Sequence, residues 1–345
     1  MISAATAFEL QDIRSVLHYR LLERSGEHLP PSSLFHYTDA NGLLGIIKSR
    51  MLWATHFQYL NDSSEFIYAS GLMKEVIAET AEGALPGSPR GRLRHTILED
   101  RDKKEDSDES GNLAEEQYVA CFSERGDGLS QWRGYGKSIG GYSLGFPFAH
   151  LGAIEQAINL KQVDQTFDSD NPQITAELFR CWYDKPAQKQ LIREAFEMAA
   201  NHCESRGEDL QDAEVAALAR AILRPVSRAY KDPAFEDERE WRLVIEIRRP
   251  PGGVSYSYGT SVDFELGKTS ANTKHEIAVE FRGGEFTLIP YVTVPLTVDG
   301  SIGIAEVVVG PTPLPEIARE AAIRYFRHHM PQVRVLPSEI PFRRV

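Results

Sequence analysis

The chain has 345 residues, of which 42% are hydrophobic and 26% are charged. This composition is typical of a globular protein with a sizeable apolar core, and it excludes disorder of the whole chain. The formal net charge of -12 makes the average surface repel nucleic acid and anionic membranes, so it weakly favours small-molecule or protein partners. Cys121, Cys181 and Cys203 form no CxxC pair, which argues against a disulfide framework or structural zinc site and favours a reducing compartment.

Membrane and export signals are absent from the sequence. No stretch reaches the roughly 20 consecutive apolar residues that span a bilayer. Residues 1–25 lack a basic start followed by an apolar signal core. We therefore expect a cytoplasmic protein with no membrane partner.

The first 80 residues predict alternating helices and strands. Apolar residues at helical spacing predict a helix over residues 5–24. The stretch "LFHYT" alternates like a short strand, and Asp39 is placed to cap the helix "ANGLLGIIKS". "MLWAT" predicts another strand, and "FIYASGLMKEVIAET" predicts a helix after the polar turn "QYLNDSSE".

The middle of the chain contains three kinds of segment in turn: a charged one, a strand-rich one and a helical one. Residues 82–117 are rich in glycine, proline and charge, which predicts an exposed charged loop insertion with helical pieces. "YVACFS" and "GYSLGF" predict strands around the glycine-punctuated stretch "GLSQWRGYGKSIG". Helical patterns dominate residues 149–232, so we expect a helical insert or subdomain there.

The last third returns to strands. "EWRLVIEIRR", "KHEIAVEF", "TLIPYVTVPL" and "IAEVVVG" predict strands, followed by the helix "PEIAREAAIRYFRHHM" and a final strand "VRVLP". The two glycines of "RGGEF" fit a hairpin turn between two of these strands. The order of strands, helices and strands predicts a single α+β domain over residues 1–345 with a mixed sheet.

The stretch "EDEREWRLVI", residues 236–245, carries the first candidate site. In a strand, Glu238, Glu240 and Arg242 share one face, and Trp241 points the other way into the core. One carboxylate can act as a base or orient a substrate hydroxyl while its neighbours tune its ionisation. The alternative is a solvent-facing strand end with a surface ion pair of little energetic value, which the charge density alone favours.

A second candidate group combines rings with hydrogen-bonding atoms. Such side chains suit the ribose and the flat rings of a nucleotide, and here they are His36, Tyr37 and Thr38 of "FHYT" with Tyr59 and Asn61 of "YLND". The alternative is a core histidine bonded to a backbone carbonyl, followed by an ordinary turn and helix cap.

A third candidate group lies in "CFSERGDGLSQWRGYG". Ser123 ends a strand and precedes a loop that carries Trp132, Arg133 and Tyr135. Aromatic and guanidinium groups on a loop can stack on a ligand. The alternative is a hydrophobic lid over the core.

Taken in order, eight short motifs resemble DUF2971, a bacterial domain family of unknown function. The motifs are "FHYT", "LWAT...YLND", "CFSE", "QWRGYG", "GYSLGF", "DEREWRL", "VVVGP" and "SEIPFR". Their shared order makes the match more specific than any one of these short motifs alone.

The layout is also similar to that of ADP-ribosyltransferases, particularly the histidine-tyrosine-glutamate class and its DNA-modifying toxin relatives. This resemblance implies a mainly antiparallel split-sheet core and NAD as a substrate. It implies that His36 binds the NAD ribose, that Tyr59 or Tyr135 stacks on nicotinamide, and that Ser123 lies on the strand supporting the NAD site. The rest of the predicted NAD site comprises Tyr37, Thr38, Asn61, Trp132 and Arg242.

The same resemblance makes Glu240 the catalytic glutamate and Glu238 its helper, which would activate the acceptor. The spacing of the aromatic residues in "QWRGYG" and the helical insert depart from the pattern of that class.

We therefore expect an intracellular effector, of a toxin or antiviral defence system, that transfers ADP-ribose from NAD to a nucleic acid or protein. Two other classes stay open. One is a non-catalytic module that senses a nucleotide or binds a partner, and the other is a nuclease or hydrolase, for which the sequence offers no set of metal ligands. A regulatory protein partner also stays open.

Overall fold

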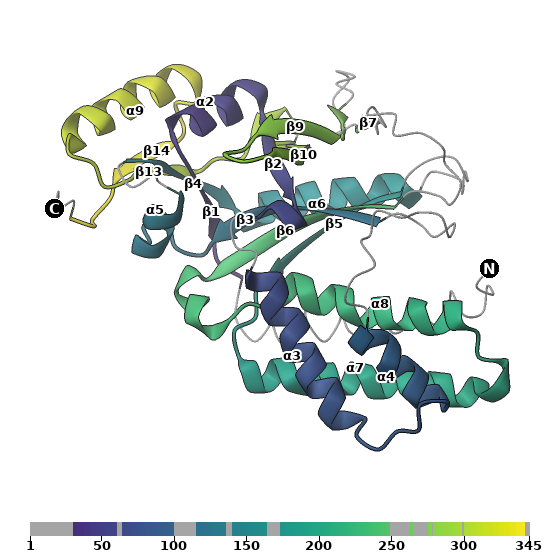
Figure 1. Cartoon of the computed structure of the whole chain (residues 1–345). Helices are drawn as coiled ribbons and strands as arrows, with labels where there is room; N and C mark the ends of the chain where they lie inside the picture. The colour runs from purple at the N-terminus through teal and green to yellow at the C-terminus, as the bar shows by residue number, and fades with distance from the viewer. Residues whose placement is uncertain are drawn as a thin grey trace. The chain divides into compact units, whose positions relative to one another are not determined.

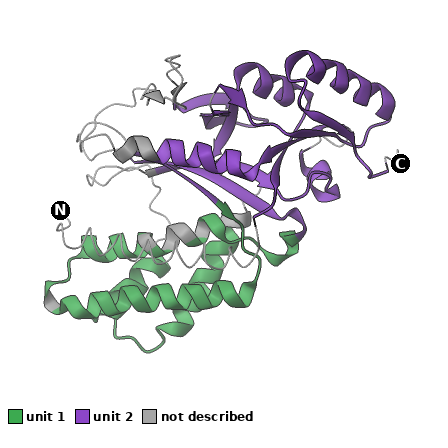
Figure 2. Cartoon of the chain, turned by 180° about the vertical axis from the view of Figure 1, so that it is seen from behind, with its two compact units in different colours: residues 1–29, 61–109, 179–236 green, residues 30–60, 110–178, 237–345 purple. Residues whose placement is uncertain are grey.

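The computed structural model describes residues 30–60, 64–99, 115–135, 140–163, 173–248, 263–264, 275–277, 279–298 and 300–341. The chain divides into two compact units (Figure 2). The helical unit comprises residues 1–29, 61–109 and 179–236, and the sheet unit comprises residues 30–60, 110–178 and 237–345. The helix expected over residues 5–24 lies outside the described residues.

The sheet unit is built on a ten-stranded sheet (Figure 1). Its order is β14-β13-β4-β1-β3-β2-β10-β9, and β6 pairs with β3 and with β5. The strands are β1 (Ser33–Thr38), β2 (Met51–His56), β3 (Glu115–Ser123), β4 (Tyr142–Pro147), β5 (Gln173–Arg180), β6 (Glu240–Arg248), β9 (Val279–Gly283), β10 (Leu288–Pro295), β13 (Glu306–Val309) and β14 (Arg334–Pro337). β13 and β14 are parallel, whereas β1, β2, β3, β4, β6, β9 and β10 make antiparallel ladders. The sheet is therefore mixed and mainly antiparallel, as predicted.

Short strands and helices complete the sheet unit. β7 (Asp263–Phe264) pairs with β8 (His275–Glu276), and β11 (Thr297–Val298) pairs with β12 (Ser301–Ile302). The helices are α2 (Ala40–Ser49), η1 (Phe57–Tyr59), α5 (Leu129–Tyr135), α6 (Phe148–Val163) and α9 (Pro315–His329). Asp39 caps α2 as predicted, because its carboxylate accepts a hydrogen bond from the Gly42 N–H at 2.8 Å.

One face of the sheet carries the main apolar core. Leu43 of α2, Ile154 of α6 and Phe326 of α9 pack into it. Trp241, which was predicted as a core anchor, points into the same core from β6. On the opposite face a smaller cluster gathers Tyr37, Trp132 and Val308.

The sheet splits at β3. One edge of β3 pairs with β6 along its whole length, from Glu115 to Ser123. On the other edge, β1 pairs at Ser123 and β2 pairs at Tyr118 and Val119. Between these points, residues 120–122 make no strand pair with the described residues on that edge. We call this gap between β1 and β2 the opening.

The helical unit contains α3 (Ser64–Thr80), α4 (Pro89–Glu99), α7 (Lys185–Arg206), η2 (Gly207–Asp209) and α8 (Asp212–Ala229). Gln188, in the first turn of α7, is fully buried. Its amide donates to the Trp182 carbonyl at 2.6 Å and to the Lys231 carbonyl at 3.1 Å, and it accepts a hydrogen bond from the Tyr68 hydroxyl at 2.6 Å. This one side chain therefore joins α3 to both ends of the α7–α8 segment.

Two segment predictions differ in part from the structure. Residues 89–99 form the helix α4, within the segment 82–117 that was expected to be exposed with helical pieces, but Leu93 and Ile97 are buried because their spacing places them on one helix face. Residues 100–114 lie outside the described residues. Within the expected helical insert over 149–232, α6 belongs to the sheet unit and residues 173–180 form β5, whose Ile174, Ala176 and Leu178 alternate into the main core.

Candidate functional site

The candidate site lies where β3 ends and β6 begins. Ser123 and Glu240 stand opposite each other in the register, and their exposed fractions are 1% and 4%. The Glu240 carboxylate accepts two hydrogen bonds from Arg242, from Nε at 2.9 Å and from Nη2 at 3.1 Å. Arg242 is 1% exposed. The alternative of a solvent-facing surface ion pair is therefore wrong for Glu240.

Glu238 does not share a strand face with Glu240. It belongs to the 3-10 helix η3 (Pro233–Glu238), and β6 begins only at Glu240. Between them Arg239 has φ = 43°, a left-handed conformation that is unfavourable for a residue with a Cβ. The prediction of a common face is wrong because this turn breaks the strand alternation.

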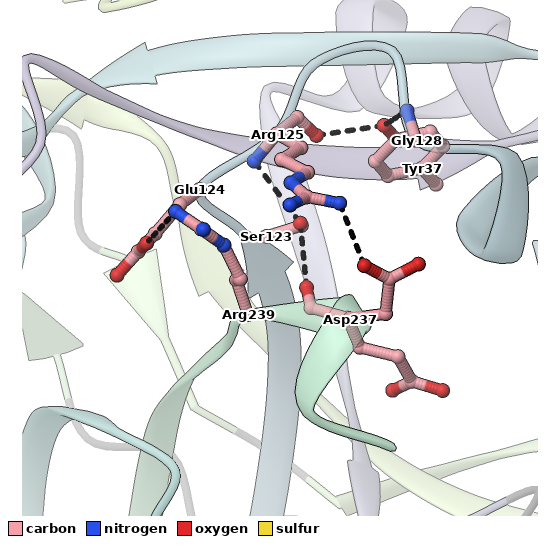
Figure 3. A network of polar contacts seen from close by, with 8 residues as sticks. Tyr37, Ser123, Glu124, Arg125, Gly128, Asp237 and Arg239 are labelled. Atoms are coloured by element: carbon pink, nitrogen blue, oxygen red, sulfur yellow. Dashed lines mark hydrogen bonds and ion pairs between the residues drawn. The ribbon is translucent and has the colours of Figure 1, made fainter. Parts of the chain in front are cut away.

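Ser123 links η3 to the loop after β3 (Figure 3). Its hydroxyl donates to the Glu238 carbonyl at 2.7 Å and accepts a hydrogen bond from the Arg125 N–H at 3.1 Å. The Arg125 guanidinium bonds the Asp237 carboxylate at 2.8 Å. These contacts hold the chain just before Glu240 against the end of β3.

A second set of contacts fixes β6 from the side. The Glu124 carboxylate accepts a hydrogen bond from the Trp241 indole N–H at 3.0 Å and lies 3.7 Å from Nη1 of Arg239. The Glu124 N–H also donates to the Arg239 carbonyl at 3.1 Å. Arg239 is therefore held in its unfavourable conformation by both its backbone and its side chain.

Tyr37 and Trp132 are parts of the framework beside the site. The Tyr37 hydroxyl donates to the Arg125 carbonyl at 2.7 Å and accepts a hydrogen bond from the Gly128 N–H at 2.8 Å (Figure 3). Burial raises the pKa of Tyr37 to about 12, so the hydroxyl keeps its proton at neutral pH. The Trp132 ring meets Tyr37 edge-on with 4.6 Å between centroids and is buried. This arrangement matches the hydrophobic-lid alternative for Trp132.

Asp127 fastens this loop to the C-terminal segment. Its carboxylate accepts hydrogen bonds from the Trp132 indole at 2.7 Å, from the Ser338 hydroxyl at 2.6 Å and from the Glu339 N–H at 2.7 Å. We call these three contacts the Asp127 latch. The site predicted from the sequence did not include Asp127, Arg125 or Asp237, although the charged run "SERGDG" directly after a strand was a signal for an ordered polar loop.

His36 borders the opening. Because a carbonyl can only accept, Nδ1 carries the hydrogen and donates to the Cys121 carbonyl at 2.9 Å. The ring also meets Phe122 edge-on, with 5.8 Å between centroids. Burial lowers the pKa of His36, and the bond to Cys121 only partly opposes this effect. The imidazole is therefore neutral at pH 7, with Nε2 as a hydrogen-bond acceptor.

The register separates His36 from Glu240. Phe35 lies opposite Ser123, which lies opposite Glu240, so these three share one face of the sheet. His36 and Thr38 alternate to the other face. His36 and Glu240 therefore lie on opposite faces of the sheet, on either side of the gap between β1 and β2.

Tyr59, Tyr135 and Asn61 are the remaining predicted residues. Tyr59, in η1, is 38% exposed and its ring meets His56 edge-on at 5.6 Å. Tyr135 is the last residue of α5 and is 36% exposed. Asn61 lies outside the described residues.

Two further properties bear on the kind of site. In the described part of the chain, no group of three or more histidine, cysteine, aspartate or glutamate side chains is arranged to hold a metal ion. Within the same residues, no helix has the length and apolar character needed to cross a membrane.

Comparison with known proteins gives one match. The matching family is DUF2971, described as a protein of unknown function. The DUF2971 match covers residues 131–243, from α5 to the start of β6, and so includes Trp132, Tyr135 and Glu240. No curated protein and no solved structure matches the chain.

Proposed function

We propose that the chain is an ADP-ribosyltransferase-like enzyme that cleaves NAD and transfers ADP-ribose to a nucleic acid or protein. The observation that carries this proposal is the split at β3, where His36 borders the opening and Glu240 begins the strand on the other edge, opposite Ser123. The proposal also takes the sheet as the ADP-ribosyltransferase type of split sheet.

The residues suit the chemistry of glycosidic cleavage. The bond between C1′ of the ribose and the nicotinamide nitrogen breaks, and nicotinamide leaves with the bonding electrons. The carboxylate of Glu240 stabilises the resulting oxocarbenium-like state by its charge and by accepting a hydrogen bond from a ribose hydroxyl. Nε2 of His36 is suited to accept a second ribose hydrogen bond from the other side of the opening. An acceptor then bonds to C1′ and loses its proton to a base.

Arg242 positions the Glu240 carboxylate. A carboxylate has about four acceptor positions, and Arg242 occupies two of them through Nε and Nη2. The bidentate pair fixes the orientation of the carboxylate, which is a requirement for electrostatic stabilisation without reorganisation.

The test uses NAD labelled on its adenylate half, with the full chain and separate protein and nucleic-acid fractions of a cell lysate. We expect nicotinamide release and transfer of label by the wild type, and a loss of about 10²–10³-fold in Glu240→Gln, the size of effect seen when one transition-state-stabilising group is removed. Absence of both products in the wild type would contradict the proposal.

The chain offers a matched control for that variant. Glu246 lies on the same strand and the same face as Glu240, is also buried, and pairs with an arginine two residues ahead, Arg248, at 2.5 Å. Glu246→Gln therefore makes the same chemical change in the same strand. Equal losses of activity in both variants would mean that Glu240 acts through the structure of β6.

The burial of Glu240 favours a second candidate, a non-catalytic module that binds a nucleotide at the same opening. This candidate predicts that NAD raises the melting temperature of the wild type while no nicotinamide is released. Substituting His36 by alanine would then remove the shift.

A further inference from the structure

Strand β9 lies at one end of the sheet (Figure 1). It pairs with β10 on one side, with Val279 opposite Val292 and Gly283 opposite Leu288. No other strand of the described residues pairs with its second edge. Such an edge presents unpaired N–H and C=O groups to any strand of suitable side chains.

Two opposite charges lie on one face of β9. Glu280 and Arg282 alternate to the face that carries Tyr291 and Thr55. The Glu280 carboxylate accepts a hydrogen bond from the Tyr291 hydroxyl at 2.5 Å, and Nη2 of Arg282 donates to the Thr55 hydroxyl at 3.2 Å. Nε of Arg282 is buried and makes no hydrogen bond with the described residues. Both charged groups are thus held in place at the edge.

The other face of the β9–β10 hairpin exposes apolar side chains. Phe281 is 45% exposed, Leu288 is 64% exposed and Phe286, in the turn, is 92% exposed. Leu288 stands opposite Gly283, and no atom lies within 4 Å of the place that a Cβ on Gly283 would occupy. Among the described residues, the hairpin therefore combines an edge without a strand partner, an apolar face and a space beside Leu288.

We propose that β9 pairs antiparallel with β9 of a second copy of this chain, centred on Phe281. In this register each Glu280 lies opposite Arg282 of the partner subunit, and the two Phe281 rings cover each other. Val279 of the partner subunit lies opposite Gly283 and fills the space beside Leu288. Opposite charges and apolar side chains that face each other across two strands stabilise the pair.

The charge pattern selects both this register and this partner. If the pairing is centred on residue 280 or on residue 282 instead of Phe281, Glu280 lies opposite Glu280 or Arg282 opposite Arg282 of the other copy. Like charges directly opposite are destabilising. A two-fold axis brings each residue to the same surface of the other copy. A strand with one acidic and one basic residue two positions apart is complementary to itself under that operation. The pairing involves neither Glu240 nor the opening, so it holds whether or not the chain is a transferase.

The test measures the mass of the full chain by analytical ultracentrifugation over a concentration series. We expect a monomer–dimer equilibrium for the wild type and dissociation constants at least about tenfold larger for Glu280→Arg and Arg282→Glu, because each variant replaces two attractive cross-strand pairs by two repulsive ones. An equimolar mixture of the two variants restores opposite charges at both pairs. We expect the mixture to dimerise more tightly than either variant alone.

The mixture separates the interface from effects on folding. Each substitution also removes a contact within the chain, to Tyr291 or Thr55, but a variant that is merely misfolded is not rescued by mixing. Glu320→Arg on α9, which changes the charge of an exposed residue far from β9 in the sheet order, is the control and leaves the equilibrium unchanged. A wild type that stays monomeric throughout the series, or a mixture no tighter than its components, overturns the proposal.

Discussion

The buried pair of Glu240 and Arg242 leads to a quantitative prediction for Glu240→Gln. The guanidinium is 1% exposed, and both of the hydrogen bonds it makes to Glu240 go to a charged carboxylate. Removing one partner of a buried pair costs about 3–5 kcal/mol of unfolding free energy. Because glutamine retains one acceptor oxygen, we expect a loss at the lower end, about 3 kcal/mol.

That loss is large enough for simple measurement. For a unit of about 150–250 residues, each kcal/mol lowers the melting temperature by roughly 2–4 °C. We therefore expect Glu240→Gln to melt about 6–12 °C below the wild type. Glu246→Gln is expected to lose only about 1–2 kcal/mol, because the guanidinium of its partner Arg248 is partly exposed, at 29%, and stays solvated.

A double-mutant cycle identifies the cause. Arg242→Met alone is also destabilising, since it leaves the Glu240 carboxylate without two hydrogen bonds. The double variant Glu240→Gln/Arg242→Met is expected to be less destabilised than the sum of the two single variants by about 2 kcal/mol or more. Denaturant titration at pH 7 measures all four proteins. Strict additivity, or a melting temperature of Glu240→Gln equal to that of the wild type, would refute the buried pair as described.

The remaining predictions concern three other buried groups. Burial lowers the pKa of His36 below its value in the unfolded chain, so the unfolded chain binds more protons just below pH 6.5 and the unfolding free energy falls as the pH decreases through that window. Denaturant titrations at several pH values should show a smaller fall for His36→Gln than for the wild type. An equal fall would assign the effect to other groups. Gln188→Leu removes three buried hydrogen bonds and is expected to lower the unfolding free energy by about 3 kcal/mol. Tyr68→Phe removes only one of them and is expected to cost about 1 kcal/mol. Similar melting temperatures for the two variants would contradict this ranking. Burial raises the pKa of the Cys203 thiol to about 11. We therefore expect mass spectrometry to detect no alkylation of Cys203 by iodoacetamide at pH 8 until denaturant is added. Rapid labelling of the native protein would show that the thiol is accessible.

Local patterns predicted much of the sheet unit. The alternation in "LFHYT" and the position of Asp39 gave β1 and the start of α2, because both depend on neighbours within four residues. The glycines of "RGGEF" gave the β9–β10 turn, where the Gly284 N–H donates to the Thr287 carbonyl. Trp241 was assigned to the core by strand period alone. The segment that became β5 was missed, although Ile174, Ala176 and Leu178 alternate, because helical patterns surround it.

The candidate site was less predictable because it depends on contacts between distant segments. The motif pattern brought Ser123 and Glu240 into consideration, and they do face each other across β3 and β6. The left-handed turn is formed by Arg239 and not by a glycine, so the sequence gives no signal for it, and Glu238 was placed on the wrong face. The opposite orientations of His36 and Glu240 follow from the pairing of Phe35 with Ser123, a register that residues 33–38 alone do not determine.

The Asp127 latch has a consequence for the order in which the molecule is completed. Asp127 and Ser338 are separated by 211 positions in the sequence, so a ribosome finishes most of the sheet unit before the loop after β3 can be fastened. Contacts of such long range form late, because the chain must first lose the freedom of the intervening residues. The loop that positions Ser123 and Arg125 therefore reaches its final form among the last steps of folding. It also follows that a fragment cut at the limits of the DUF2971 match, residues 131–243, would lack His36, Ser123, Asp127 and the C-terminal segment that Asp127 binds.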